Sequence, residues 1–486
     1  MKKIITKYNA LSLPTKAALW FTFANFVIKG VAFITVPLFT RYLSTEEYGI
    51  VSVFLSYQQI LLIFATFEMY SGAYIRGLLR YKSNTSLFTY SEQLLSSLIT
   101  ICIFVISIPI LPWFIEETET NKVIYALMFI YFLFFPAYQC WANRKRFEYD
   151  YKPVVITAIL YSIITTVIPL AAIIVGERTA IIRITYMLIS EALFCLPFYI
   201  KNVRPRYLAS NRVELKEQWK FLLSFQGPSV VHSLSFLVLS QADRVMIGDM
   251  VGKSEAGIYS VAYSIASVIT VLSVSSGQVL KPWRYQKMES KDYFSIKRNS
   301  NFLLIGFGTM IILWILIAPE FMHFLFPDSY YNAVWIIPPV SMGVFFMFLY
   351  SMFVDIEEYF YKTKYTMYAT LICASLNILL NYIGIKMYGY MACAYTTLIC
   401  YVLFAILHCF WANKAVKPSN ISIGQIFDLR VIIGLSIFFL ICEIALTFAY
   451  RSIIVRYIVF SFIIIIAIIN RKNIKKRLDG VINVKR

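Results

Sequence analysis

The chain has 486 residues, of which 59% are hydrophobic and only 15% are charged, and its mean hydropathy is +0.69. A soluble globular domain is about half apolar and a quarter charged, so this composition excludes an ordinary soluble protein and indicates a polytopic membrane protein. Lysine and arginine outnumber the acids 45 to 26, and the positions of these basic residues decide what the excess means.

Fourteen apolar segments follow one another along the chain, each long enough to cross a bilayer as a helix of about 20 residues. The sequence therefore predicts an all-α polytopic membrane protein with about 14 transmembrane helices. The N-terminal MKKIITK leads into a segment long enough to stay in the membrane, so no cleavable signal peptide is expected. The predicted spans lie near residues 17–40, 48–70, 92–112, 122–142, 153–175, 179–200, 221–248, 256–280, 300–326, 332–355, 365–386, 388–411, 430–449 and 452–470.

The connections between these segments alternate in charge. Those on the side that holds both termini carry roughly five times as many Lys and Arg residues as those on the other side, which by the positive-inside rule predicts cytoplasmic termini. The expected location is the bacterial cytoplasmic membrane. The basic excess is thus explained by topology, and nucleic acid is not an expected partner.

A short internal repeat organises the chain. The run EYGIVSV at 47–53 returns as EAGIYSV at 255–261, an offset of 208 residues, and both copies lie at the hinge between two apolar segments. Similarity at equivalent hinges is typical of an internal repeat. We therefore expect an N-terminal lobe at 1–210, a C-terminal lobe at 211–415, and a last helix pair with a basic cytoplasmic tail at 416–486.

The sequence has no recognisable catalytic or metal site. It contains no phosphate-binding G-x-x-x-x-G-K-[ST] motif, and its loops are too short to fold as catalytic domains. The eight cysteines lie in or beside apolar segments without paired spacing, and the three histidines are scattered, so disulfides and metal ligands are not expected. An enzyme is not expected.

Ionisable residues inside predicted spans are the default site candidates, because burying a charge in a bilayer costs a few kcal/mol or more. Lys29 lies near the middle of the first span, four residues after Asn25. It is expected to line a substrate cavity or to pair with an acid of a neighbouring helix. Glu191 is similarly central in the sixth span and can pair with Lys29, carry a proton, or pack.

Further candidates lie nearer the helix ends. Asp243 and Arg244 are adjacent, so they diverge by about 100° on a helix and should reach separate partners, either between lobes or in transport. Arg76 and Arg80 lie four residues apart at the inner end of the second predicted helix, two turns after Glu68. Two guanidinium groups on one face suit a diphosphate, although a cytoplasmic anchor explains them as well.

The second half has counterparts of these residues. Lys281 and Arg284 end the eighth predicted helix in a KPWR turn. They too can be interpreted as a diphosphate site or as a cytoplasmic anchor. Polar faces on three helices suit either sugar hydroxyls or hydrogen bonds between helices. Their members are Gln58, Gln59, Gln226, Gln241, Asn377 and Asn381.

Three stretches resemble a known family. PLFTRYLSTEEYG, ADRVMIGDMVGKSEAGIYSVAY and NILLNYIGIKMYGYMACAYTTLICYV are similar, in this order, to the polysaccharide transporter family of oligosaccharide flippases in the multidrug/oligosaccharidyl-lipid/polysaccharide exporter superfamily. The resemblance implies two six-helix lobes around a central cavity. It maps a cationic site onto Lys29, Arg76 and either Arg244 or Lys281. The last two helices resemble the extra pair of peptidoglycan-precursor flippases, where that pair helps to form a groove for the lipid tail.

The resemblance also implies a function. The expected substrate is an undecaprenyl-diphosphate-linked oligosaccharide repeat unit, moved across the membrane by alternating access for O-antigen, capsule or a related glycan. No cofactor is expected. The energy is expected to come either from a proton or sodium gradient or from the downhill disposal of the substrate. A polysaccharide polymerase and a chain-length regulator are candidate partners. The alternative is an ion-coupled multidrug exporter of the same superfamily, which needs an acidic cavity, whereas the clear charge in the middle of the first span is a lysine.

Overall fold

The computed structural model describes residues 13–203 and 212–473, and within them every regular element is a helix. Thirteen helical segments are long and apolar enough to cross a membrane, and the shorter apolar helix α19 (Ile453–Ile469) follows them. The predicted all-α polytopic fold is confirmed, and each of the fourteen predicted spans has a helical counterpart. Both chain ends, at 1–12 and 474–486, lie outside the described residues, so the predicted cytoplasmic termini stay a prediction.

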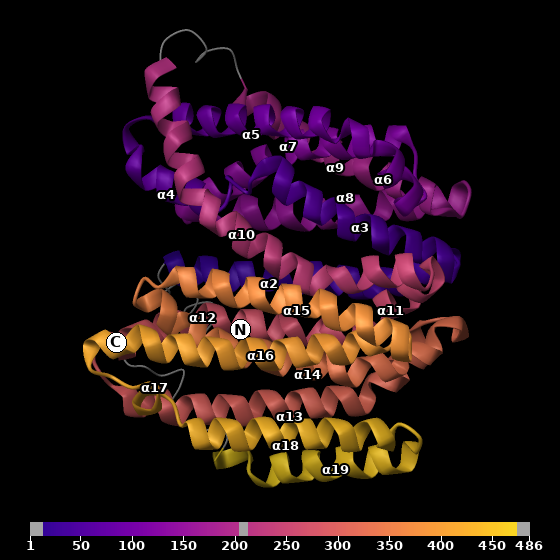
Figure 1. Cartoon of the computed structure of the whole chain (residues 1–486), viewed down its shortest axis with the longest axis vertical. Coiled ribbons are helices and arrows are strands. Elements are labelled where there is room, and N and C mark those ends of the chain that lie inside the picture. Colours follow the sequence, from indigo (N-terminus) through magenta and orange to yellow (C-terminus); the bar gives the residue numbers. More distant parts are fainter. Residues whose placement is uncertain (1–12, 204–211, 474–486) are drawn as a thin grey trace, which may run out of the picture. The chain divides into compact units, whose positions relative to one another are not determined.

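The chain divides into two compact units, residues 1–260 and 261–486. In the first unit α7 packs against α5 and α9, and these three helices run alongside one another in Figure 1. Helix α3 packs against α5 and α10. The helices of this unit are α2 (Leu13–Tyr42), α3 (Thr45–Thr66), α4 (Gly72–Arg80), α5 (Thr85–Ser107), α6 (Leu111–Thr118), α7 (Lys122–Phe147), α8 (Tyr151–Val175), α9 (Ala180–Asn202) and α10 (Arg212–Met250).

Polar caps begin three of these helices directly after short turns. The side chain of Ser44 accepts a hydrogen bond from Glu47 N at 3.1 Å, and Asn121 accepts one from Ile124 N at 3.0 Å. Thr179 does the same at the start of α9. Such caps satisfy backbone N–H groups that a helix start leaves free, which fixes where each span begins after its turn.

Helix α10 contacts α3, α4 and α5 and therefore packs within the first unit. The division predicted from the sequence places a boundary at residue 210, just before α10, and that division stays a prediction. Helix α11 (Lys253–Ala266) begins in the same unit and continues into the next.

The second predicted span is interrupted in the structure. Helix α3 ends at Thr66, and the next two residues, Phe67 and Glu68, have φ values of 50° and 45°. Both values lie in the left-handed region, which non-glycine residues adopt at a cost of about 1 kcal/mol or more each. The prediction that Glu68, Arg76 and Arg80 share one helix is therefore wrong, because α4 is a separate helix.

The two hinge copies of the repeat meet within the first unit, where α3 crosses the start of α11. A Cβ atom on Gly49 would lie 1.6 Å from the carbonyl oxygen of Lys253, and one on Gly257 would lie 2.2 Å from that of Thr45. The Ser254 hydroxyl donates to Thr45 Oγ1 at 2.8 Å. Only glycine permits so close a backbone approach.

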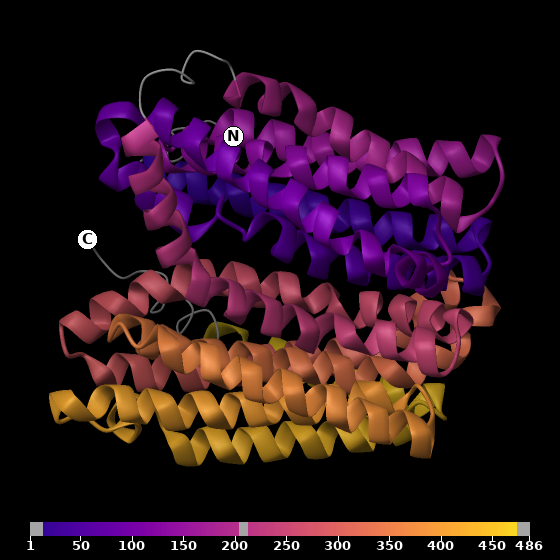
Figure 2. The ribbon, with the colours of Figure 1, turned by 45° about the horizontal axis from the view of Figure 1, so that its top comes forward.

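The helices of the second unit also run side by side, and Figure 2 shows them in colours from pink through orange to yellow. Helix α16 packs against α14 and α15, and α13 packs against α14 and α18. The remaining elements are α12 (Thr270–Glu289), α13 (Tyr293–Leu325), α14 (Ile337–Tyr359), α15 (Thr363–Tyr388), α16 (Ala392–Val416), α17 (Ile423–Ile426) and α18 (Leu429–Ala449).

Three turns between helices have the same geometry around a left-handed residue other than glycine. The turn between α7 and α8 contains Tyr149 and the turn between α14 and α15 contains Tyr361, each with a φ of 56°. Lys291, between α12 and α13, has a φ of 55°. The same turn geometry therefore ends helices in both units.

A charged pair closes the turn between α12 and α13. Lys287 Nζ donates to Asp292 at 2.6 Å, and Asp292 accepts the backbone N–H of Ser295 at 3.1 Å as the cap of α13. The hydrogen bond from Lys287 lowers the pKa of Asp292 to about 2. The ionised Asp292 therefore stabilises this turn at pH values above the ordinary pKa of an aspartate. This contribution is lost as the pH falls through about 2.

Candidate functional site

Lys29 lies near the middle of the 30-residue helix α2, about equally far from both ends. Its side chain is exposed, as is that of Asn25 one turn earlier. Among the described residues no hydrogen bond or ion pair reaches Lys29. A lysine in the middle of a span is costly in lipid, so its charge requires water or an anionic ligand.

Glu191 on α9 is the centre of a polar network inside the first unit. It accepts hydrogen bonds from Gln58 Nε2 at 3.4 Å and from the Tyr161 hydroxyl at 3.3 Å. The Tyr131 hydroxyl lies 3.3 Å from that of Tyr161. The ion pair between Glu191 and Lys29, one of the alternatives from the sequence, is not found. Neutral donors of α3 and α8 bind the Glu191 carboxylate instead.

Arg76 and Arg80 differ in their surroundings although both are exposed on α4. Arg80 pairs with Glu217 of α10 at 3.2 Å, and its guanidinium lies 5.1 Å from the centroid of the Phe221 ring. Arg76 has no ion pair or hydrogen bond among the described residues. The structure therefore leaves Arg76 available to an anionic ligand, whereas Arg80 is partly neutralised.

Asp243 and Arg244 contact separate groups on and beside α10. Asp243 is buried and accepts a hydrogen bond from the Tyr259 hydroxyl at 2.6 Å. Arg244 donates to Ser240 O and to Gln241 Oε1, both at 2.8 Å. Asp243 thus joins α10 to α11, whereas these two hydrogen bonds of Arg244 stay within α10. A direct role of either residue in transport stays a prediction.

Lys281 and Arg284 lie inside α12, which continues to Glu289, so the prediction that they end a helix in a turn is wrong. Each pairs with an acid of α14: Lys281 with Glu358, and Arg284 with Asp355. Arg284 is almost completely buried. These two cations are compensated by protein groups, unlike Lys29 and Arg76.

Breaking the buried pair is expected to destabilise the protein strongly. Arg284→Met leaves Asp355 as a buried charge without its partner, which costs about 3–5 kcal/mol. The double variant Arg284→Met with Asp355→Leu should recover most of this loss, because an apolar pair of similar volume replaces the ion pair. Melting temperatures of the purified proteins test this expectation, and equal loss in the single and double variants would contradict it.

Asn377 and Asn381 on α15 are buried and face α16. Asn377 Nδ2 donates to Thr397 Oγ1 at 3.1 Å, Asn381 Nδ2 donates to Asn377 Oδ1 at 3.2 Å, and Thr396 donates to Asn381. Of the two interpretations, sugar contacts or hydrogen bonds between helices, the structure shows the hydrogen bonds. Their contact with a sugar stays a prediction.

Four buried acidic groups were not among the residues predicted from the sequence: Glu92, Asp355, Glu357 and Glu443. Glu357 of α14 is fully buried and contacts His408 Nδ1 at 2.9 Å, while the Thr366 hydroxyl donates to it at 3.0 Å. Glu92 of α5 is also fully buried and accepts a hydrogen bond from the Cys140 thiol at 2.9 Å. The sequence signal of these two acids is weaker than that of Glu191, because Glu92 is the first residue of the predicted span 92–112 and Glu357 lies two residues beyond the predicted span 332–355.

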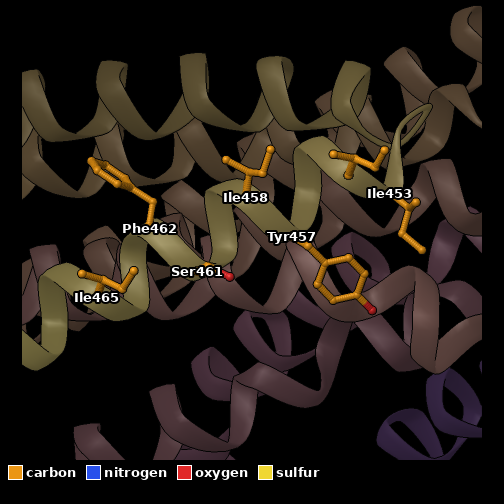
Figure 3. Close-up of a pocket in the computed structure, with 7 residues that line it drawn as sticks. Ile453, Tyr457, Ile458, Ser461, Phe462 and Ile465 are labelled. Carbon is orange, nitrogen blue, oxygen red and sulfur yellow. The ribbon is translucent and has the colours of Figure 1, made fainter.

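An apolar pocket of about 590 Å³ lies along α19 (Figure 3). Its lining side chains in Figure 3 include Tyr457 and Phe462, with Ser461 as a polar member. Such a lining suits a hydrocarbon chain and cannot compensate a diphosphate. The other lining residues are Ile453, Ile454, Ile458 and Ile465.

The described residues hold no group of three or more His, Cys, Asp or Glu side chains that could bind a metal ion. What the arrangement offers is an exposed cation in the middle of a helix, a second exposed cation on α4, and carboxyls held by neutral donors. These features can bind an anionic group and exchange protons.

Comparison with known proteins gives two overlapping family matches. The polysaccharide biosynthesis protein family matches residues 15–288, which is more than half of the chain, and the MatE family matches residues 228–383. The succinoglycan biosynthesis transport protein ExoT of Rhizobium meliloti (strain 1021) is 24% identical over 288 residues, covering 58% of this chain and 55% of ExoT. The matched stretch thus spans about half the length of this curated relative.

Two solved structures have similar folds. The lipid II flippase MurJ in an inward closed conformation superposes with a TM-score of 0.66 at 14% identity, covering 94% of this chain and 100% of MurJ. An inward-facing multidrug resistance MATE transporter of the MOP superfamily gives 0.59 at 12% identity, with coverage of 82% and 98%. At sequence identities this low, the structural similarity shows a shared fold.

Proposed function

The chain belongs to the polysaccharide biosynthesis protein family of the MOP exporter superfamily, and from this membership we propose that it is a flippase for an undecaprenyl-diphosphate-linked oligosaccharide. The family makes it a multi-pass membrane transporter. The proposal adds three points: the substrate, the location in the cytoplasmic membrane, and the use of the translocated unit in O-antigen, capsule or a related surface glycan.

The observation that carries the proposal is the environment of Lys29. An exposed ammonium group in the middle of a span, with no ion pair among the described residues, favours an anionic ligand over a cationic one. A diphosphate offers several charged oxygens to such a donor, and charge-assisted hydrogen bonds are the stronger kind. Arg76, also without an ion pair in the described part of the chain, is a second candidate contact for this group.

The physical task of such a transporter is to carry a hydrophilic headgroup across hydrocarbon while the prenyl chain stays in lipid. No covalent bond changes, so cations and polar side chains suffice and no catalytic group is needed. The apolar pocket along α19 suits the prenyl chain. Alternating access then requires only that substrate or ion binding shifts the populations of two conformations.

The decisive experiment is lipid translocation in liposomes. The purified full chain is reconstituted with a fluorescent undecaprenyl-diphosphate oligosaccharide, with and without a proton or sodium gradient. Accelerated flipping supports the proposal, and its dependence on the gradient identifies the coupling ion. Association with a polymerase and a chain-length regulator can be tested afterwards by co-purification.

A multidrug exporter is the second candidate, favoured by the MatE match over 228–383 and by the half-buried Glu191, an acid in the middle of a span. The same liposomes distinguish the two functions. Export of cationic dyes without lipid movement would overturn the flippase proposal and establish the alternative.

A further inference from the structure

Glu92 is a buried acid without a cationic partner. It is the eighth residue of α5, about 10 Å from the start of the helix, and its side chain is fully buried. Its Oε2 accepts the Cys140 thiol at 2.9 Å, and its Oε1 has no hydrogen-bond partner among the described residues. A thiol is a weak donor, so this contact compensates little of a full negative charge.

The helices packed against α5 bring no positive charge to this acid in the described part of the chain. Helix α3 carries charged residues only in its first turn, far from the end that meets α5. Arg144 of α7 pairs with Glu148 at 3.1 Å. The other helices packed against α5 carry cations with exposed side chains: Arg76 and Arg80 of α4, Lys201 of α9, and Lys216 and Lys220 of α10. The titratable and polar groups near this segment of α5 are Cys140 of α7, Tyr70 and Tyr74 at the α3–α4 break, Tyr199 of α9 and Trp219 of α10.

Three further oxygen atoms near Glu92 have no hydrogen-bond partner among the described residues. They are Ser91 Oγ, Gln93 Oε1 and Ser96 Oγ. All three side chains are buried. Neither serine hydroxyl donates to the Glu92 carboxyl, so the Cys140 thiol is its one hydrogen-bond donor in the described part of the chain.

An ionised carboxylate in this position would cost several kcal/mol, because neither a cation nor a strong donor compensates it. We propose that Glu92 is a proton-binding site: its carboxyl is neutral in this conformation and exchanges its proton with water when the adjacent α3–α4 break opens. In that step the O–H bond of Glu92 breaks, the proton passes to water, and the electron pair stays on the carboxylate.

The α3–α4 break is the natural route for water. Its freed backbone is held by side chains of other helices: Asn143 Nδ2 donates to Tyr70 O at 2.7 Å, and Ala73 N donates to Gln226 Oε1 at 3.2 Å. Tyr70 in this break lies near Glu92. A strained segment that depends on two distant side chains can open without disrupting the helices on either side.

Infrared difference spectroscopy of the full chain in liposomes tests directly whether the Glu92 carboxyl carries a proton. Wild type at neutral pH should show the C=O stretching band of a protonated carboxyl that is lost in Glu92→Gln, a substitution of nearly equal shape. Glu443→Gln on α18 is the matched control, since it removes another buried acid and should leave the Glu92 band unchanged. Equal spectra for wild type and Glu92→Gln would show an ionised Glu92 and overturn the proposal.

A second variant assigns the band without removing the acid. In Cys140→Ser a hydroxyl replaces the thiol, and because the hydroxyl is the stronger donor, the Glu92 band should move to lower frequency. An unchanged band would show that it does not come from the carboxyl beside Cys140. A band that appears only when sodium is absent would identify a metal cation as the ligand and also overturn the proposal.

The use of this proton in transport rests on the proposed function. In the flipping assay Glu92→Gln should keep flipping without a gradient within about threefold of wild type and lose its acceleration by a proton gradient. Retained acceleration would overturn a role in coupling. If wild type itself moves no lipid, the proposed function fails, while the infrared result still decides whether Glu92 holds a proton.

Discussion

Replacing Lys29 with alanine is expected to reduce flipping of the diphosphate-linked lipid by at least about tenfold. The change removes an ammonium group from the middle of α2, where a hydrogen bond to a charged ligand contributes about 1.5–3 kcal/mol, and 1.4 kcal/mol corresponds to a factor of ten. The amount of folded protein should not change, because Lys29 has no protein partner among the described residues. Initial flipping rates in liposomes and surface glycan in cells both measure the effect.

Lys29→Arg is the matched control, since it keeps the charge at the same place. It should retain most of the activity, which separates a need for charge from a need for packing. Normal glycan in cells carrying Lys29→Ala at wild-type protein levels would remove Lys29 from the site. The proposal would then depend on Arg76 alone.

Replacing Gly49 with alanine should destabilise the protein by about 3 kcal/mol or more. The new Cβ would lie 1.6 Å from the carbonyl oxygen of Lys253, a backbone atom that no side-chain rotation can move away. Overpacking of a tight contact costs about 1–3 kcal/mol even when the neighbours can adjust, and here α3 or the start of α11 must shift as a whole. The melting temperature of the purified protein should fall clearly.

Gly434→Ala provides the comparison. Gly434 also lies in a transmembrane helix, α18, but a Cβ there would meet nothing within 4 Å. Alanine favours a helix over glycine by up to about 1 kcal/mol, so this variant should be as stable as wild type or slightly more so. Equal melting temperatures for the two variants would show that the close contact of Gly49 does not limit stability.

The membrane spans could be predicted from the sequence because a long apolar run has few other structures available to it. Turn residues such as Ser44 and Asn121 also mark helix starts locally. The break after Thr66 could not be predicted in this way. Its left-handed residues are Phe67 and Glu68, not glycines, and the partners that hold the break come from α7 and α10.

The candidate site was predictable only in part. An ionisable residue in an apolar segment is visible in sequence, so Lys29 and Glu191 could be identified. Sequence does not show which neighbour compensates a charge, and Arg284 and Asp355 come together from helices separated by about 70 residues. Both Lys29 and Lys281 were candidate cations from the sequence, but only Lys281 has an ion-pair partner among the described residues.

The contact between the two glycines bears on how the gene arose. Gly49 contacts Lys253, and Gly257 contacts Thr45. Gly49 and Gly257 are separated by the 208-residue offset of the repeat, and so are Thr45 and Lys253. In a symmetric dimer residue i contacts j and j contacts i, so a half-length ancestor that paired with its own copy would make this contact twice. In that ancestor one mutation of the glycine would have damaged both contacts, whereas after duplication and fusion each copy can vary separately. The reciprocal contact of Gly49 and Gly257 within the first unit has the geometry that such an ancestral pairing predicts.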